Sequence, residues 1–139
     1  MGTLNVASVS PGLYAANGNG AGVAAAAYVR ASAPTAGALV FSCQGGIALS
    51  CLSTPISLGA ASDTVYVTLY ASGIRGAQDV QVYVAGQSVP VIFAGAQGQY
   101  AGLDQVNITI PRALAGTGEA SVYVVADGKT SNMTTLNIQ

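Results

Sequence analysis

The stretch TVYVTLYA, residues 64–71, alternates aliphatic side chains with tyrosine and threonine. Successive side chains of a β-strand point to opposite faces, so this period of two predicts a strand with two different faces. The aliphatic face carries Val65, Val67 and Leu69. The other face carries Tyr66, Thr68 and Tyr70. We therefore expect the strand to pack its aliphatic face against a core.

Similar short stretches lie before and after residues 64–71. They are separated by Gly, Pro, Asn and Asp, which favour turns. They predict further strands over residues 3–10, 22–31, 38–42, 79–85, 89–94, 104–110, 119–126 and 129–138. Residues 85–88 and the Asp127-Gly128 pair are typical of hairpin turns. Residues 111–116 are expected to cross between strands, with room for one helical turn.

About eight or nine short strands with this spacing predict an all-β fold, an immunoglobulin-like β-sandwich. The length of 139 residues corresponds to one domain. We expect residues 11–139 to form it. Residues 1–10 are expected to be an N-terminal strand or linker strand.

Charged residues make up 6% of the chain, against about 25% in an average domain. The chain has 4 basic residues, 5 acidic residues and no His. This composition excludes a Ser-His-Asp triad, an imidazole metal site and a basic surface for nucleic acid. The 51% hydrophobic content excludes disorder, and no apolar run is long enough to span a membrane. No cofactor, metal or catalytic residue is predicted.

Two cysteines, Cys43 and Cys51, flank a short segment that contains two glycines. Two thiols without His cannot supply the four ligands of a structural zinc site. A local disulfide is therefore favoured over two free buried thiols. It would indicate an oxidising compartment, so we expect an extracellular or cell-surface protein whose leader is not in this chain.

The chain resembles a known family over residues 10–139. The resemblance rests on SPGLYAANGNGAG (10–22), PISLG (55–59), DTVYVTLYASGIRG (63–76) and the run from VYVAGQ to DGKTSN (82–132). These stretches are similar to the C-terminal module of large secreted proteins from Solibacter and other acidobacteria. The resemblance implies an immunoglobulin-type sandwich at the cell surface and no catalytic residue. The chain departs from the common pattern in having Tyr where Phe is frequent, and in its short, nearly uncharged loops.

The N-terminal TLNV, residues 3–6, is similar to the C-terminal TLNI, residues 135–138. One interpretation is two ordinary strands of similar composition. The other is an intermolecular strand that pairs with a neighbouring subunit by β-augmentation and builds a filament. The candidate residues of this strand are Leu4, Val6 and Val9.

Among the few charges, Arg75 is expected to pair with a carboxylate, Asp104 first and Asp63 second. Such a pair would fix loops, with ligand binding as the alternative. Four tyrosines alternate with aliphatic residues, and they would form one patch if their strands were neighbours in one sheet. They are Tyr66, Tyr70, Tyr83 and Tyr123. The patch would be a protein–protein interface or a sugar-stacking platform, unless the rings form a second wall of the core or scattered surface.

The sequence therefore predicts a non-enzymatic extracellular module for adhesion or assembly at the cell surface. Its expected partner is protein, through self-association or a neighbouring domain, and a filament joined by strand addition is one form of it. The alternative is a carbohydrate-binding module appended to a secreted protein.

Overall fold

The structure is a computed structural model that describes residues 9–44 and 50–139. These residues form an all-β architecture of thirteen strands and one short 3₁₀-helix, η1 (Arg112–Leu114). The first sheet contains β1 (Gly12–Leu13), β2 (Ala26–Arg30), β3 (Ala33–Leu39), β6 (Val65–Ser72), β9 (Val91–Ala96) and β10 (Asp104–Thr109). The second sheet contains β7 (Val80–Val84), β8 (Gln87–Val89), β11 (Gly118–Ala126), β12 (Lys129–Thr130) and β13 (Thr134–Ile138). A separate hairpin consists of β4 (Phe41–Gln44) and β5 (Ser50–Ser53).

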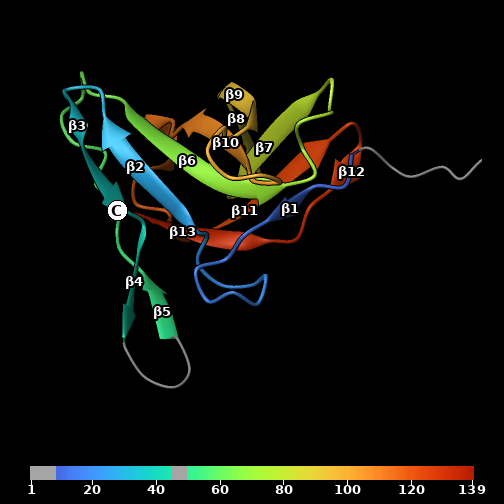
Figure 1. Ribbon diagram of the computed structural model, residues 1–139. Helices are drawn as coiled ribbons and strands as arrows, with labels where there is room; N and C mark the ends of the chain where they lie inside the picture. The colour runs from blue at the N-terminus through green and yellow to red at the C-terminus, as the bar shows by residue number, and fades with distance from the viewer. Residues whose placement is uncertain (1–8, 45–49) are drawn as a thin grey trace, which may run out of the picture.

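All strand pairs within the sheets are antiparallel. The first sheet has the order β3-β2-β6-β10-β9, and β1 pairs with the end of β6 that extends beyond β2. The second sheet has the order β12-β11-β7-β8, and β13 pairs with the other half of β11. Figure 1 shows the β4–β5 hairpin standing away from both sheets.

The core lies between the two sheets. Four alternate residues of β6 are buried: Val65, Val67, Leu69 and Ala71. Alternate residues of the second sheet are buried in the same hydrophobic cluster: Val82, Val84, Val122, Val124 and Leu136. The period of two predicted for residues 64–71 is therefore confirmed, and the layering is consistent with a β-sandwich.

Three of the predicted strands are interrupted. Residues 89–94 divide at Pro90, which cannot donate to a sheet ladder, so β8 lies in the second sheet and β9 in the first. Residues 38–42 divide at Val40, whose side chain turns into the core. Residues 129–138 divide before Thr134. In this gap the Asn132 side chain accepts the Leu13 N–H at 2.7 Å and donates to two carbonyls of the N-terminal segment.

The two predicted hairpin turns are present, and both require backbone with positive φ. Ala85 and Gly86 have φ of 52° and 78°, and Asp127 and Gly128 have φ of 48° and 81°. Positive φ at both central residues is the property of a type I′ turn, which matches the twist of the flanking strands. The Asp127-Gly128 turn joins β11 to β12, and the Ala85-Gly86 turn joins β7 to β8.

We expect Ala85→Asn to stabilise the protein. Left-handed backbone is costly for Ala, whereas Asn followed by Gly is the preferred type I′ pair. The free energy of unfolding should rise by about 0.5–1 kcal/mol, measured by urea denaturation. Ala115→Asn is the control, because Ala115 lies in an exposed turn with φ of −55° and should gain nothing. Equal changes in both variants would contradict the interpretation.

Candidate interaction surface

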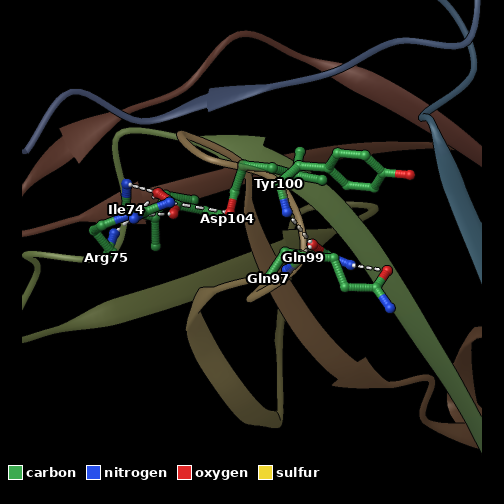
Figure 2. A network of polar contacts seen from close by, with 7 residues as sticks. Ile74, Arg75, Gln97, Gln99, Tyr100 and Asp104 are labelled. Carbon is green, nitrogen blue, oxygen red and sulfur yellow. Dashed lines mark hydrogen bonds and ion pairs between the residues drawn. The ribbon is translucent and has the colours of Figure 1, made fainter.

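A buried carboxylate joins two loops at one end of the sandwich. Asp104, the first residue of β10, is 1% exposed and lies opposite Ala71 on the core side of the first sheet. Its Oδ2 accepts the backbone N–H groups of Ile74 and Arg75 at 2.8 and 3.1 Å. Its Oδ1 accepts the Nε–H of Arg75 at 2.7 Å (Figure 2). Arg75 thus forms an ion pair with Asp104, the first of the two carboxylates predicted as its partner.

The same ion pair supports the loop between β9 and β10. Arg75 Nη2 donates to the Leu103 carbonyl at 3.1 Å, at the base of this loop. Within the loop, Gln97 Oε1 accepts the N–H groups of Gln99 and Tyr100 at 2.8 and 3.2 Å. Tyr100 is 67% exposed, and Figure 2 shows its ring pointing away from Arg75. The loop is therefore held by hydrogen bonds at its base and within its turn.

The second candidate carboxylate, Asp63, belongs to a separate cluster. Asp63 accepts hydrogen bonds from the Ser32 N–H and hydroxyl and from the Thr64 N–H. The Arg112 guanidinium donates to four carbonyls of the same loop, those of Leu58, Gly59, Ala60 and Asp63. A shallow depression of about 360 Å³ lies beside it, with Asp63, Pro90 and Arg112 in its wall. Because these charged groups already bond to the chain, the cluster is explained as a loop anchor.

The predicted disulfide is confirmed. Cys43 and Cys51 lie directly opposite each other in the β4–β5 hairpin and are bonded. The Asn17 side chain accepts the Cys51 N–H at 2.7 Å, so the hairpin is also fixed to the N-terminal part of the domain. A disulfide is compatible with an extracellular protein.

The four tyrosines do not form one patch, because their strands belong to different sheets. Tyr66 and Tyr70 lie on β6 in the first sheet. Tyr83 and Tyr123 lie opposite each other on β7 and β11 in the second sheet, with their rings stacked at 5.2 Å. The condition for a single patch, that the four strands are neighbours in one sheet, is therefore not met. Alternation tells which face a side chain takes, but it does not tell which strands are neighbours.

The candidate intermolecular strand is only partly described. Leu4 and Val6 lie outside the described residues. Val9 is buried in the core of its own domain, and its carbonyl accepts the Lys129 ammonium at 3.0 Å. The side chain of Val9 therefore packs within its own chain in this structure, which gives no support to an intermolecular role for it.

The edge of β13 that faces away from β11 is hydrogen-bonded to other segments of the same chain. Thr135 exchanges two backbone hydrogen bonds of 2.9 Å with Gly22 and Ala24. Ile56 donates to Asn137 at 2.8 Å on the same side of the strand. A strand from a neighbouring copy therefore has no place beside β13.

The first sheet has an outer face without charge. The outer face consists of the β6 residues Tyr66, Thr68 and Tyr70 and the residues paired beside them in the other strands. Arg30 and Asp104 are opposite Val65 and Ala71, on the core side. The other charged residues lie in loops, in η1 or in the second sheet: Asp63, Arg75, Asp79, Arg112, Glu119, Asp127 and Lys129.

Both edge strands of this sheet are uncharged as well. Within the described residues, β3 pairs only with β2 and β9 pairs only with β10. The sequence of β3 is APTAGAL, and that of β9 is VIFAGA. Exposed apolar side chains lie on both strands, with Leu39 on β3 and Ile92 and Phe93 on β9. The sequence feature that indicates these neutral edges is the absence of charged residues from 31–62 and 80–103.

Among residues 9–44 and 50–139, no group of three or more Cys, Asp or Glu side chains is arranged to hold a metal ion. In the same residues, no helix is long and apolar enough to cross a membrane. Comparison of the chain with models of known protein families, with curated proteins and with solved structures gave no match.

Replacing Asp104 by Ala should destabilise the protein by about 3 kcal/mol, because two backbone N–H groups and the Arg75 guanidinium lose their acceptor. Arg75→Ala should cost about 1–2 kcal/mol, since Asp104 keeps the two backbone donors. Urea denaturation measures both changes. Asp79→Ala is the control, because Asp79 is exposed and should change stability by less than about 0.5 kcal/mol. An Arg75→Ala variant with an unaltered Tm would contradict a structural role for the pair.

The stabilising effect of Asp63 should depend on pH. The hydrogen bond from the Ser32 hydroxyl is the main reason why the pKa of Asp63 lies below its ordinary value, and backbone N–H groups and Arg30 act in the same direction. A lowered folded-state pKa gives stability that is present above the ordinary Asp pKa of about 3.9 and is lost as pH falls through the folded value. Asp63→Asn should therefore lower the Tm at pH 7, and the difference should shrink below about pH 4. A difference that stays constant down to pH 2 would contradict this.

Proposed function

We propose that this protein is a non-enzymatic, extracellular structural module of immunoglobulin-like type. It associates with copies of itself, or with a neighbouring domain of similar kind, through the edge strands of the first sheet. The observation that carries the proposal is the absence of charge from both free edges, β3 and β9.

Free sheet edges expose unpaired N–H and C=O groups, and natural proteins protect them with charged side chains, prolines, β-bulges or coverage. Strand β3 has two such devices, Pro34 near its beginning and a register shift where it passes from Tyr28 to Arg30 of β2. Strand β9 has one such device, a register shift at Ile92, but it has neither a charge nor a proline, and Ile92 is 56% exposed. We therefore regard β9 as the principal associating edge and β3 as the second.

The two edges differ in what they can build. Four antiparallel steps separate β3 from β9 in the sheet, so the two strands run in the same direction. Two β9 strands related by a two-fold axis would pair in antiparallel fashion and give a closed dimer. A β9 edge placed on the β3 edge of the next copy would be a heterologous contact, which continues into a filament unless it closes into a ring.

The extracellular part of the proposal is supported by the Cys43–Cys51 disulfide. The non-enzymatic part is supported by the use of the carboxylates. Asp63, Asp104 and Asp127 each accept backbone N–H groups, so their oxygens already have roles in loop structure. The two remaining acidic residues, Asp79 and Glu119, have exposed side chains, and the Asp79 N–H is itself a donor to Asp127 at 2.8 Å.

The test is a lysine on each edge, Ile92→Lys on β9 and Ala36→Lys on β3. The wild-type protein should associate in a concentration-dependent manner in sedimentation velocity, and electron microscopy should distinguish dimers from filaments. Ile92→Lys should abolish association, because pairing would bury an unpaired charge. Ala36→Lys should abolish filaments but leave a β9-paired dimer.

Ala113→Lys is the matched control, since it adds the same charge at an exposed position in η1. It should associate like the wild type. A wild-type protein that stays monomeric at all concentrations would overturn the proposal. Equal effects of Ala113→Lys and Ile92→Lys would overturn it too, because net charge and not the edge would then be responsible.

A further inference from the structure

A row of side chains crosses the outer face of the first sheet, perpendicular to the strands. Tyr70 on β6 lies opposite Gln105 on β10, and Gln105 lies opposite Gly95 on β9. On the other side of β6, the N–H of Tyr14, the residue after β1, donates to the Tyr70 carbonyl at 3.0 Å, and the Tyr70 N–H donates to the Ala25 carbonyl at 3.2 Å. Leu13 pairs with Ala71 on the core side, so the next residue, Tyr14, lies on the outer side, and it is 47% exposed. Paired residues point to the same face, and neighbouring strands are about 4.8 Å apart, so the row extends over about 14 Å.

The glycine at the end of the row is covered by an aromatic ring. A Cβ on Gly95 would lie 3.2 Å from Phe93 Cζ, with two further ring carbons within 4 Å. The Phe93 ring therefore lies over Gly95, in the space that a larger residue would fill. Phe93 and Tyr14 are 44% and 47% exposed, so both ends of the row are open to a ligand.

An amide pair supplies the polar groups of the row. Gln105 Nε2 donates to Asn107 Oδ1 at 3.2 Å, and both side chains are half-buried on the outer face. This hydrogen bond orients the two amides and leaves the Gln105 Oε1 as an acceptor and the Asn107 Nδ2 as a donor. In order along the row, the groups are therefore the Tyr14 ring, the Tyr70 ring, the Gln105 amide and the Phe93 ring.

These features restrict the chemical class of ligand that the row can bind. The outer face has no charged side chain, so an ionic ligand or an ordinarily charged protein surface would lose hydration there without gaining a partner. The face of an aromatic ring is electronegative and attracts weakly positive C–H groups. A pyranose presents such C–H groups on its faces and hydroxyl groups at its rim, which matches the rings and the amide pair.

We infer that the row formed by Tyr14, Tyr70, Gln105 and Phe93 binds a neutral polysaccharide of equatorially linked hexopyranose units. Equatorial linkages keep successive sugar rings in one flat ribbon, and a flat ribbon can contact a line of rings on a sheet face. One sugar unit of such a chain has about the length of one strand spacing. This inference does not rest on edge pairing, because it uses the side chains of the face and not the main chain of the edge.

The test uses two neutral β-1,4-glucans, cellohexaose in isothermal titration calorimetry and hydroxyethyl cellulose in affinity gel electrophoresis. The wild-type protein should bind both and should not bind polygalacturonate, which is anionic. Tyr70→Ala and Phe93→Ala should each weaken binding about tenfold, because each removes one stacking surface. Because Phe93 is exposed, Phe93→Ala tests the row with little effect on the core, and circular dichroism melting checks both variants for folding.

Tyr83→Ala is the matched control, as it removes a ring of the same type from the second sheet and should bind like the wild type. Repeating the titrations with Ile92→Lys separates sugar binding from association, because this variant should bind glucan while remaining monomeric. The inference is overturned if the wild type binds neither glucan, or if Tyr83→Ala weakens binding as much as Tyr70→Ala. It is also overturned if Tyr70→Ala and Phe93→Ala alter sedimentation but not sugar binding, since the face would then contact a second copy of the chain.

Discussion

The pairing of β6 determines both the core and the outer surface of the first sheet. This strand contacts β1 and β2 along one edge and β10 along the other. Its register buries every second side chain between the sheets and turns Tyr66, Thr68 and Tyr70 outward. A slip of one residue would exchange the two faces, because the period of a strand is two. The core and the aromatic row are therefore consequences of one register.

The few charged side chains of this protein mainly hold loops in place. Asp104 joins two loops through the buried end of β10, Arg112 and Asp63 anchor the loop before β6, and Asp127 caps the start of β7. These side chains fix loop ends by bonding to the backbone or to each other. The outer face and edges of the first sheet are left neutral, and both proposals on association and on sugar binding follow from that neutrality.

Much of the local structure could be predicted from the sequence. The alternation at residues 64–71 and 104–110 is the direct trace of strands with one buried face, and the Asp127-Gly128 turn has the backbone conformation that its residues favour. The cysteines were close enough in sequence for a local disulfide. The Arg75–Asp104 contact was suggested by the shortage of charges, since a buried carboxylate in such a chain has few possible partners.

The tertiary structure alone decided which strands are neighbours. Alternation is a local property, whereas membership of a sheet depends on contacts between residues far apart in the chain. For this reason the sequence could not separate Tyr70 from Tyr83, nor foresee that Pro90 carries the chain from one sheet to the other. Nor could it place Tyr14 and Phe93 in line with Tyr70, because that row exists only across four strands. The sequence by itself determined the faces of the strands, and the fold determined which faces meet.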